Sequence, residues 1–147
     1  MRSIHAKGRD NARTPMQWDD SVNAGFTGGT PWIKVNPNYK EVNARAAVED
    51  GNSVFHYYKK LIALRKKYNI FTEGTYKPVL LEDANIFSYI RESGEKKLLV
   101  VANFYGEEIP YEILEEFRTS GEILIHNYGD TEKNILRPYE AMMIYLR

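Results

Sequence analysis

The spacing of apolar positions changes close to residue 70 of this chain. From residue 53 to residue 68 apolar residues recur every three or four positions, and lysines crowd the opposite side. This pattern predicts a helix over 53–68, capped by Asn52 or Ser53, and preceded by a shorter helix over 41–50 that ends at Gly51. The apolar face of the longer helix comprises Phe55, Tyr58, Leu61, Ile62 and Leu64.

After Asn69 the period becomes two, which is typical of strands. Short strands at regular spacing, separated by turn residues, are typical of an antiparallel β-sandwich. The predicted strands are 74–81, 85–92, 96–104, 107–111, 122–126 and 139–146. Residues 1–40 show neither period and hold several prolines and glycines, so we expect a long loop there. Loops of that length are uncommon unless they are functional or taken out of a larger context.

The composition excludes several classes of function. Acidic and basic residues balance to a formal net charge of +0, whereas nucleic acid and anionic membranes call for a basic surface. The longest apolar run, 98–102, is far too short to span a bilayer. Cysteine is absent and residues 1–8 hold no signal peptide, which together favour a cytoplasmic location.

The most informative segment is 7–20, which reads KGRDNARTPMQWDD. Two arginines, several hydrogen-bonding side chains, a proline and a tryptophan lie close together here, a composition that suits an ordered polar loop around a hydroxylated ligand. The segment resembles, almost letter for letter, part of the α-glucosidases of glycoside hydrolase family 13, in the oligo-1,6-glucosidase, dextran glucosidase and trehalose-6-phosphate hydrolase group. Further blocks in the same order, such as VNPNY at 35–39, LVVANF at 99–104 and LRPYEA at 136–141, extend this resemblance over nearly the whole chain.

The resemblance implies a mainly β fold: an antiparallel β-sandwich preceded by the end of a (β/α)8 barrel. Residues 1–70 would be the loop after strand eight and the final barrel helix, and residues 71–147 the C-terminal sandwich domain. The parent enzyme would be a retaining α-glucosidase acting on short α-1,6-linked glucosides. The chain's partners would then be the rest of the barrel and, in the intact enzyme, the short α-glucoside.

Retaining hydrolysis needs two carboxyl groups about 5–5.5 Å apart, one as nucleophile and one as acid/base. By the family pattern these groups lie on earlier barrel strands, and Asp10, Asp19 and Asp20 do not match them. We therefore expect no catalytic residue in this chain and no activity of the chain alone. Arg9 and Arg13 are the candidate sugar-contacting residues that the resemblance implies, since a guanidinium can bond a sugar hydroxyl and a carboxylate together. The alternative is that both arginines hold the loop through backbone carbonyls.

Other residue types indicate no cofactor and no metal. His5 and His56 have no partners at metal-ligand spacing, and His126 lies in a predicted strand and is expected to be structural. Trp18 and Trp32 could stack on sugar faces, but packing is the commoner role of such residues. The apolar stripe of helix 53–68 is wider than a small sandwich needs. We therefore expect the isolated chain either to self-associate through this helix and the 1–40 loop, as a homo-oligomer, or to leave residues 1–40 poorly ordered.

Two other classes of function stay open. The chain could be a free-standing carbohydrate-binding or protein-interaction module, provided that Tyr76, Phe87 and Tyr89 form an exposed, coplanar platform. A complete small hydrolase is disfavoured because the sequence offers neither a convincing carboxylate pair nor a Ser-His-Asp set. Affinity for isomaltose separates the module from the enzyme part, which would show almost none.

Overall fold

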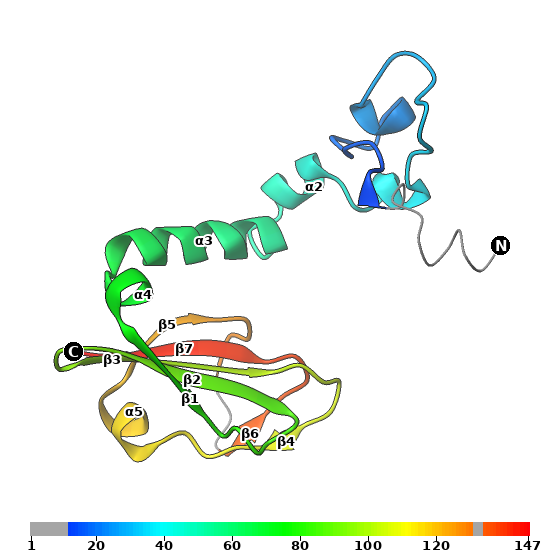
Figure 1. Cartoon of the computed structure of the whole chain (residues 1–147). Coiled ribbons are helices and arrows are strands. Elements are labelled where there is room, and N and C mark those ends of the chain that lie inside the picture. The colour runs from blue at the N-terminus through cyan, green and yellow to red at the C-terminus, as the bar shows by residue number, and fades with distance from the viewer. Residues whose placement is uncertain (1–11, 131–133) are drawn as a thin grey trace. The chain divides into compact units, whose positions relative to one another are not determined.

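The computed structural model describes residues 12–130 and 134–147, and it forms two compact units, Met1–Tyr58 and Lys59–Arg147. Figure 1 shows helices in the first part of the chain and, in the second part, the strands together with further short helices. The predicted mainly β fold class, with a C-terminal antiparallel sandwich, is confirmed. The domain boundary between residues 70 and 71 stays a prediction.

The described part of the first unit is a loop with short helical turns. The turns η2 (Val22–Gly25) and η3 (Pro37–Lys40) interrupt the predicted loop, and helix α2 (Ala44–Glu49) follows. Helix α2 starts later than predicted because Asn43 caps it: its Oδ1 accepts a hydrogen bond of 2.9 Å from the Ala46 amide. The loop and α2 are tied together, since the Ala44 and Arg45 amides donate to the carbonyls of Gln17 and Trp18 at 2.9 and 3.0 Å.

Helix α3 (Val54–Lys67) lies within the predicted span 53–68. Ser53 Oγ accepts a long hydrogen bond of 3.4 Å from the His56 amide at its first turn, and three basic residues fill its last turn. No residue of this helix is buried, and Phe55, Tyr58 and Ile62 are 46%, 63% and 48% exposed. The apolar face predicted for this helix therefore stands open in the chain as described.

The second unit is built on a five-stranded antiparallel sheet in the order β1-β2-β3-β7-β5. Its strands are β1 (Thr75–Val79), β2 (Ile86–Ser93), β3 (Lys96–Asn103), β5 (Glu122–His126) and β7 (Ala141–Leu146). Strands β2 and β3 form a hairpin in which Ser93 pairs with Lys96, so only two residues make the turn. Gly94 takes a φ of 62° there, which such a tight turn requires.

One face of this sheet carries the main core. Helix α5 (Glu115–Ser120) and the two-stranded sheet of β4 (Ile109–Pro110) and β6 (Ile135–Leu136) lie on this face (Figure 1). Phe117 of α5 and Leu136 of β6 are 1% and 0% exposed, and both belong to this core. The other buried members are Ile86, Ile90, Leu99, Val101, Tyr111, Met142 and Ile144.

The opposite face of the sheet is covered only in part. Helix α4 (Ile70–Glu73) packs on it through Ile70, against Leu98, Val100 and Tyr145. Arg91 fixes this helix to the sheet, since its guanidinium donates to the carbonyls of Ile70 and Gly74 at 2.9 and 2.6 Å. The sheet thus has one closed face and one face that α4 closes at a single end.

The predicted strands correspond to the long strands of the sheet, with small shifts at their ends. The strand predicted at 107–111 is much shorter than expected: only Ile109–Pro110 pair, because Pro110 has no amide hydrogen to extend the ladder. Helices α4 and α5 and strand β6 were not predicted.

Candidate functional site

The two predicted sugar-contacting arginines have different positions in the structure. Arg9 lies outside the described residues. Arg13 is exposed, and among residues 12–130 and 134–147 its guanidinium has no hydrogen-bond or ion-pair partner. Within the described chain Arg13 therefore does not bond the backbone carbonyls that a loop-holding role would require, and its donors are available to a ligand.

The loop that follows Arg13 is organised around the carboxylate of Asp19. The amide and hydroxyl of Ser21 donate to Asp19 Oδ1 at 2.9 and 2.5 Å, and Arg45 Nη2 lies 2.8 Å from Oδ2. The guanidinium of Arg45 also approaches Asp20 at 3.5 Å. The hydrogen bonds from Ser21, assisted by the charge of Arg45, hold the pKa of Asp19 below its usual value. Asp19 thus stays ionised and links the loop to helix α2.

These contacts decide against an acid/base role for Asp19. A general acid of a glycosidase needs a raised pKa, so that it carries a proton near neutral pH. Asp19 has the opposite shift, and its oxygens already accept bonds from Ser21 and Arg45. Asp10 lies outside the described residues. The described loop therefore holds a structural carboxylate rather than a catalytic one.

Three consecutive residues in the left-handed backbone conformation also hold the shape of this loop. Asn23, Ala24 and Gly25 take φ values of 57°, 59° and 67°, in the left-handed region that L-residues seldom adopt. Ala24 is fully buried, and its carbonyl accepts the amides of Trp18 and Asp19 at 2.9 and 3.3 Å. A side chain at Gly25 would meet Asp19 Oδ1 at 2.7 Å, so the close packing there requires glycine. Strained backbone of this kind is typical of loops whose exact shape serves a function.

A second set of bonds joins the loop to the segment before α2. Gln17 donates to the Asn38 side chain at 3.1 Å and also to the Val42 carbonyl. Asn43, which caps α2, donates to the Tyr39 carbonyl at 2.9 Å. From residue 12 onward the described loop is therefore an ordered polar scaffold.

The two tryptophans do not act as packing anchors within the chain. Trp32 is 91% exposed and Trp18 is 54% exposed, although the backbone of Trp18 takes part in the loop's hydrogen bonds. Trp32 lines a shallow hollow of about 490 Å³ together with Thr14, the residue next to Arg13. An exposed indole beside a hollow could contact a sugar, but packing against another part of a larger protein would leave it equally exposed here.

The second unit holds an ion cluster that the sequence did not reveal. Glu140 is fully buried, and its Oε1 lies 2.6 Å from His126 Nε2. Its Oε2 accepts the Arg137 amide at 2.7 Å and the Arg137 Nε at 3.1 Å. Arg137 continues to Asp130 at 2.9 Å and stacks 4.0 Å from the ring centre of Tyr128. The blocks around 126–127 and 136–141 were the only sequence signal for this cluster.

Burial and hydrogen bonding shift the pKa of Glu140 in opposite directions. Burial opposes its ionisation, but the bonds from Arg137 and His126 outweigh burial and lower the pKa of Glu140. Glu140 therefore remains a carboxylate beside Arg137, which supports a structural role for His126 as well. The buried charges are paired, as they must be in a stable interior.

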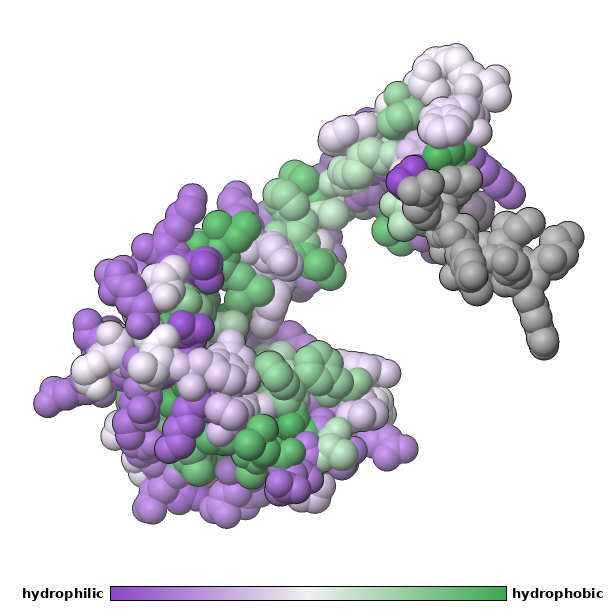
Figure 2. All heavy atoms as spheres, viewed as in Figure 1, coloured by the Kyte–Doolittle hydropathy of each residue, from purple (hydrophilic) through white to green (hydrophobic). Residues whose placement is uncertain are grey.

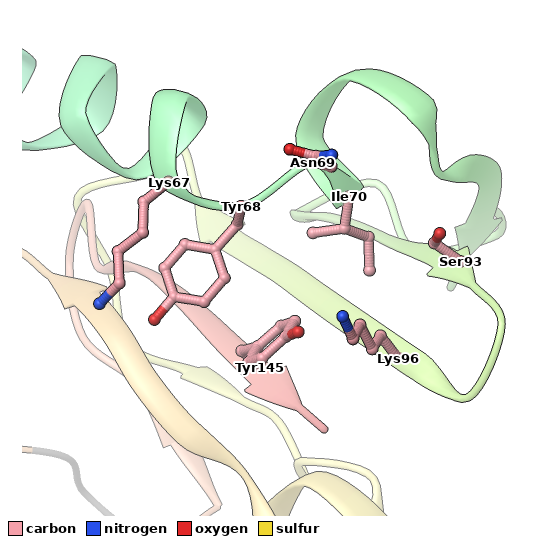
Figure 3. A pocket seen from close by; sticks show the side chains of 7 residues that line it. All are labelled: Lys67, Tyr68, Asn69, Ile70, Ser93, Lys96 and Tyr145. Carbon is pink, nitrogen blue, oxygen red and sulfur yellow. The ribbon is translucent and has the colours of Figure 1, made fainter.

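Figure 3 shows a pocket of about 290 Å³ where the end of α3 and helix α4 meet the sheet. The rings of Tyr68 and Tyr145 meet edge to face at its centre, with centroids 5.0 Å apart, and Lys67 and Lys96 lie at its sides. No carboxylate lines this pocket and both lysines are exposed, so it offers no glycosidase chemistry. In the described chain no group of three or more His, Cys, Asp or Glu residues could hold a metal, and no helix there is long and apolar enough to cross a membrane.

Two family models match this chain. Residues 1–74, half of its length, match the model of the alpha amylase catalytic domain, and residues 86–142 match that of the alpha-amylase SusG C-terminal domain. The chain therefore belongs to the α-amylase family of glycoside hydrolases, as the resemblance of its motifs predicted. It corresponds to the C-terminal part of such an enzyme.

Individual relatives refine this assignment. Over its whole length the chain is 54% identical to an oligo-1,6-glucosidase of Bacillus cereus, and over 97% of its length it is 48% identical to a trehalose-6-phosphate hydrolase of Bacillus subtilis strain 168. The crystal structure of Bacillus licheniformis trehalose-6-phosphate hydrolase matches 98% of the chain with a TM-score of 0.90 at 40% identity, and the chain covers 27% of that structure. It also spans only 27% of the length of both curated relatives.

Proposed function

We propose that this chain forms the C-terminal part of a retaining α-glucosidase that hydrolyses short α-1,6-linked glucosides. The observation that carries this proposal is the identity of 51–55% to three oligo-1,6-glucosidases. A trehalose-6-phosphate hydrolase is 48% identical and a further oligo-1,6-glucosidase 44% identical, so the two activities share this part of the enzyme. In this role the rest of the catalytic barrel would bind the chain and supply the reacting carboxylates.

The loop geometry supports a contribution to sugar binding. The loop's shape is held by the hydrogen bonds around Asp19 and by the left-handed backbone at residues 23–25. The loop therefore does not need Arg13 for its own structure. A pre-positioned guanidinium can donate to sugar hydroxyls at little cost in ordering. We therefore assign Arg13, together with Arg9, to the substrate-facing side of the intact enzyme.

The same geometry supports inactivity of the chain alone. Asp19 and Asp20 converge on Arg45 rather than on an open cleft, and the pKa of Asp19 is lowered rather than raised. Glu140 is enclosed by Arg137 and His126 and does not reach solvent. Neither pair offers the nucleophile and the protonated acid that retaining hydrolysis requires.

A titration and an assay of the purified chain test this reading against the open alternative of a free-standing module. We expect negligible binding of isomaltose by calorimetry and no release of p-nitrophenol from p-nitrophenyl α-glucoside. Tight isomaltose binding that is lost on mutation of Tyr76 would instead support a carbohydrate-binding module. Turnover that disappears when an aspartate of this chain is replaced would contradict the proposed inactivity. The cytoplasmic location stays a prediction.

A further inference from the structure

The pocket drawn in Figure 3 is lined by hydrogen-bond donors from four parts of the second unit. They come from the end of α3, the start of α4, the β2–β3 hairpin and strand β7. The volume of the pocket, about 290 Å³, is close to the lower end of the roughly 300–1,000 Å³ that is usual for small-molecule sites. The pocket therefore suits a small molecule better than a peptide.

Tyr145 is the most enclosed of these donors. The residue is only 5% exposed, and its ring packs edge to face against that of Tyr68. Its hydroxyl has no hydrogen-bond partner in the described chain, and the only fully enclosed side-chain N or O atom there without a partner is Ser88 Oγ. The Tyr145 hydroxyl must therefore open into the pocket that the residue lines. A polar group held in this way needs a partner from outside the chain.

Lys67 and Lys96 give the pocket its charge. Figure 3 shows their ammonium groups on opposite sides of the two tyrosine rings. Neither ammonium has an ion-pair partner among the described residues, although Lys67 Nζ lies 5.0 Å from the ring centre of Tyr68. In Figure 2 the surface around the end of α3 is hydrophilic. Two unpaired positive charges beside one pocket that no carboxylate lines attract an anion.

The sheet separates Lys96 from the carboxylate that neutralises its neighbour. Side chains alternate along β3, so Lys96 shares a face with Leu98, which packs against Ile70 of α4. Lys97 lies on the other face, where its Nζ meets Glu116 Oε2 at 2.7 Å. Lys96 has no such partner, so its charge is available to a ligand.

The neutral donors indicate the kind of anion. The Asn69 amide, the Ser93 hydroxyl and the hydroxyls of both tyrosines line the same pocket as the two lysines. A phosphoryl group carries about −1.5 to −2 charges near pH 7 and has three strong acceptor oxygens. It can balance both ammonium groups and accept from several neutral donors at once, whereas a carboxylate brings one charge and two oxygens.

We propose that this pocket binds the phosphoryl group of a small molecule, with Lys67 and Lys96 as its charged ligands and the Tyr145 hydroxyl as a neutral donor. The phosphoryl group can belong to free phosphate or to a phosphorylated metabolite, because both present the same oxygens. The site lies wholly within the second unit, so this inference goes beyond the proposed function and does not depend on it.

Calorimetric titration of the full chain at low ionic strength tests the site, with inorganic phosphate, glucose 6-phosphate and glucose as probes. We expect both phosphates to bind with dissociation constants of about 1 mM or below, and glucose not to bind. Tighter binding of glucose 6-phosphate would support a phosphorylated metabolite as the occupant, and equal binding of the two phosphates would support phosphate itself. Equal binding of glucose and glucose 6-phosphate, or no binding of either phosphate, would overturn the proposal.

Three variants locate the binding: Lys67→Ala, Lys96→Ala and Tyr145→Phe. Each lysine variant should weaken phosphate binding roughly tenfold, and Tyr145→Phe should weaken it less, because a neutral donor contributes less than a charged one. Lys97→Ala is the matched control, since it removes the same charge from the adjacent residue on the other face of the sheet. Unchanged binding in the three pocket variants, or equal weakening in Lys97→Ala, would overturn the assignment, with an unchanged midpoint of thermal unfolding showing that each variant is folded.

Discussion

His126 Nε2 lies 2.6 Å from Oε1 of Glu140, and both side chains are almost fully enclosed. The bond joins β5 to the start of β7, and Arg137 meets the same carboxylate from the segment after β6. A single buried carboxylate thus connects three segments of the second unit.

Replacement of this carboxylate should destabilise the chain strongly. Glu140→Ala leaves His126 and Arg137 without their shared partner inside the fold, and breaking a buried ion pair costs about 3–5 kcal/mol. Urea unfolding of the isolated chain measures the change. The control is Glu122→Ala, which removes an exposed pair with Arg147 and should cost less than about 1 kcal/mol. Similar losses for the two variants would show that the cluster does not support the fold.

Stability should also depend on pH through Glu140. The folded pKa of this carboxyl lies below its ordinary value, so the unfolded chain binds the proton more readily. The stabilisation is therefore complete above the ordinary glutamate pKa of about 4.3 and is lost as the pH falls through the lower, folded pKa. Unfolding midpoints between pH 7 and pH 3 should fall more steeply in the wild type than in Glu140→Gln. Parallel curves would contradict this assignment.

The left-handed backbone at residues 23–25 predicts a strict requirement for glycine at position 25. Gly25→Ala forces a methyl group within 2.7 Å of Asp19 Oδ1 at a φ of 67°. The substitution should lower the free energy of opening this loop by at least about 1 kcal/mol. Gly28→Ala is the control, because an added Cβ there meets no atom within 4 Å. Amide exchange at Trp18 and Asp19, whose amides donate to Ala24, should accelerate only in Gly25→Ala.

The arginines of the loop should affect catalysis without affecting the fold. The test uses a joined protein, in which this chain replaces the matching C-terminal part of the Bacillus cereus oligo-1,6-glucosidase. Loss of a hydrogen bond from a charged donor to the substrate costs about 1.5–3 kcal/mol, so Arg9→Ala or Arg13→Ala in this protein should lower kcat/KM for isomaltose roughly 10- to 100-fold. Lys34→Ala, an exposed lysine of the same loop, is the control. Unchanged kinetics in both arginine variants, at unchanged Tm, would remove these residues from the substrate-facing side.

The sequence predicted the long elements better than the short ones, for physical reasons. Strands such as β2 and β3 alternate over eight residues, so their period is visible. Helix α4 has four residues and β6 has two, too few to show any period, and their positions depend on packing against the sheet.

The candidate site shows the same division. The polar loop was recognisable because its residues are adjacent in sequence. Neighbours such as Asp19 and Arg45 are 26 residues apart, and the buried cluster joins Glu140 to His126 across 14 residues. Pairings of this kind are set by the fold. The local sequence pattern therefore showed neither that Asp19 is ion-paired with Arg45 nor that Arg13 has no partner in the described chain.

We propose that this chain completes an α-glucosidase without catalysing the reaction itself. The most direct measurement is isomaltose hydrolysis by three preparations: the isolated chain, the Bacillus cereus enzyme truncated where this chain would follow, and the joined protein. We expect turnover in the joined protein alone. Turnover by the isolated chain, or a stable and folded joined protein that cleaves no α-glucoside, would contradict it.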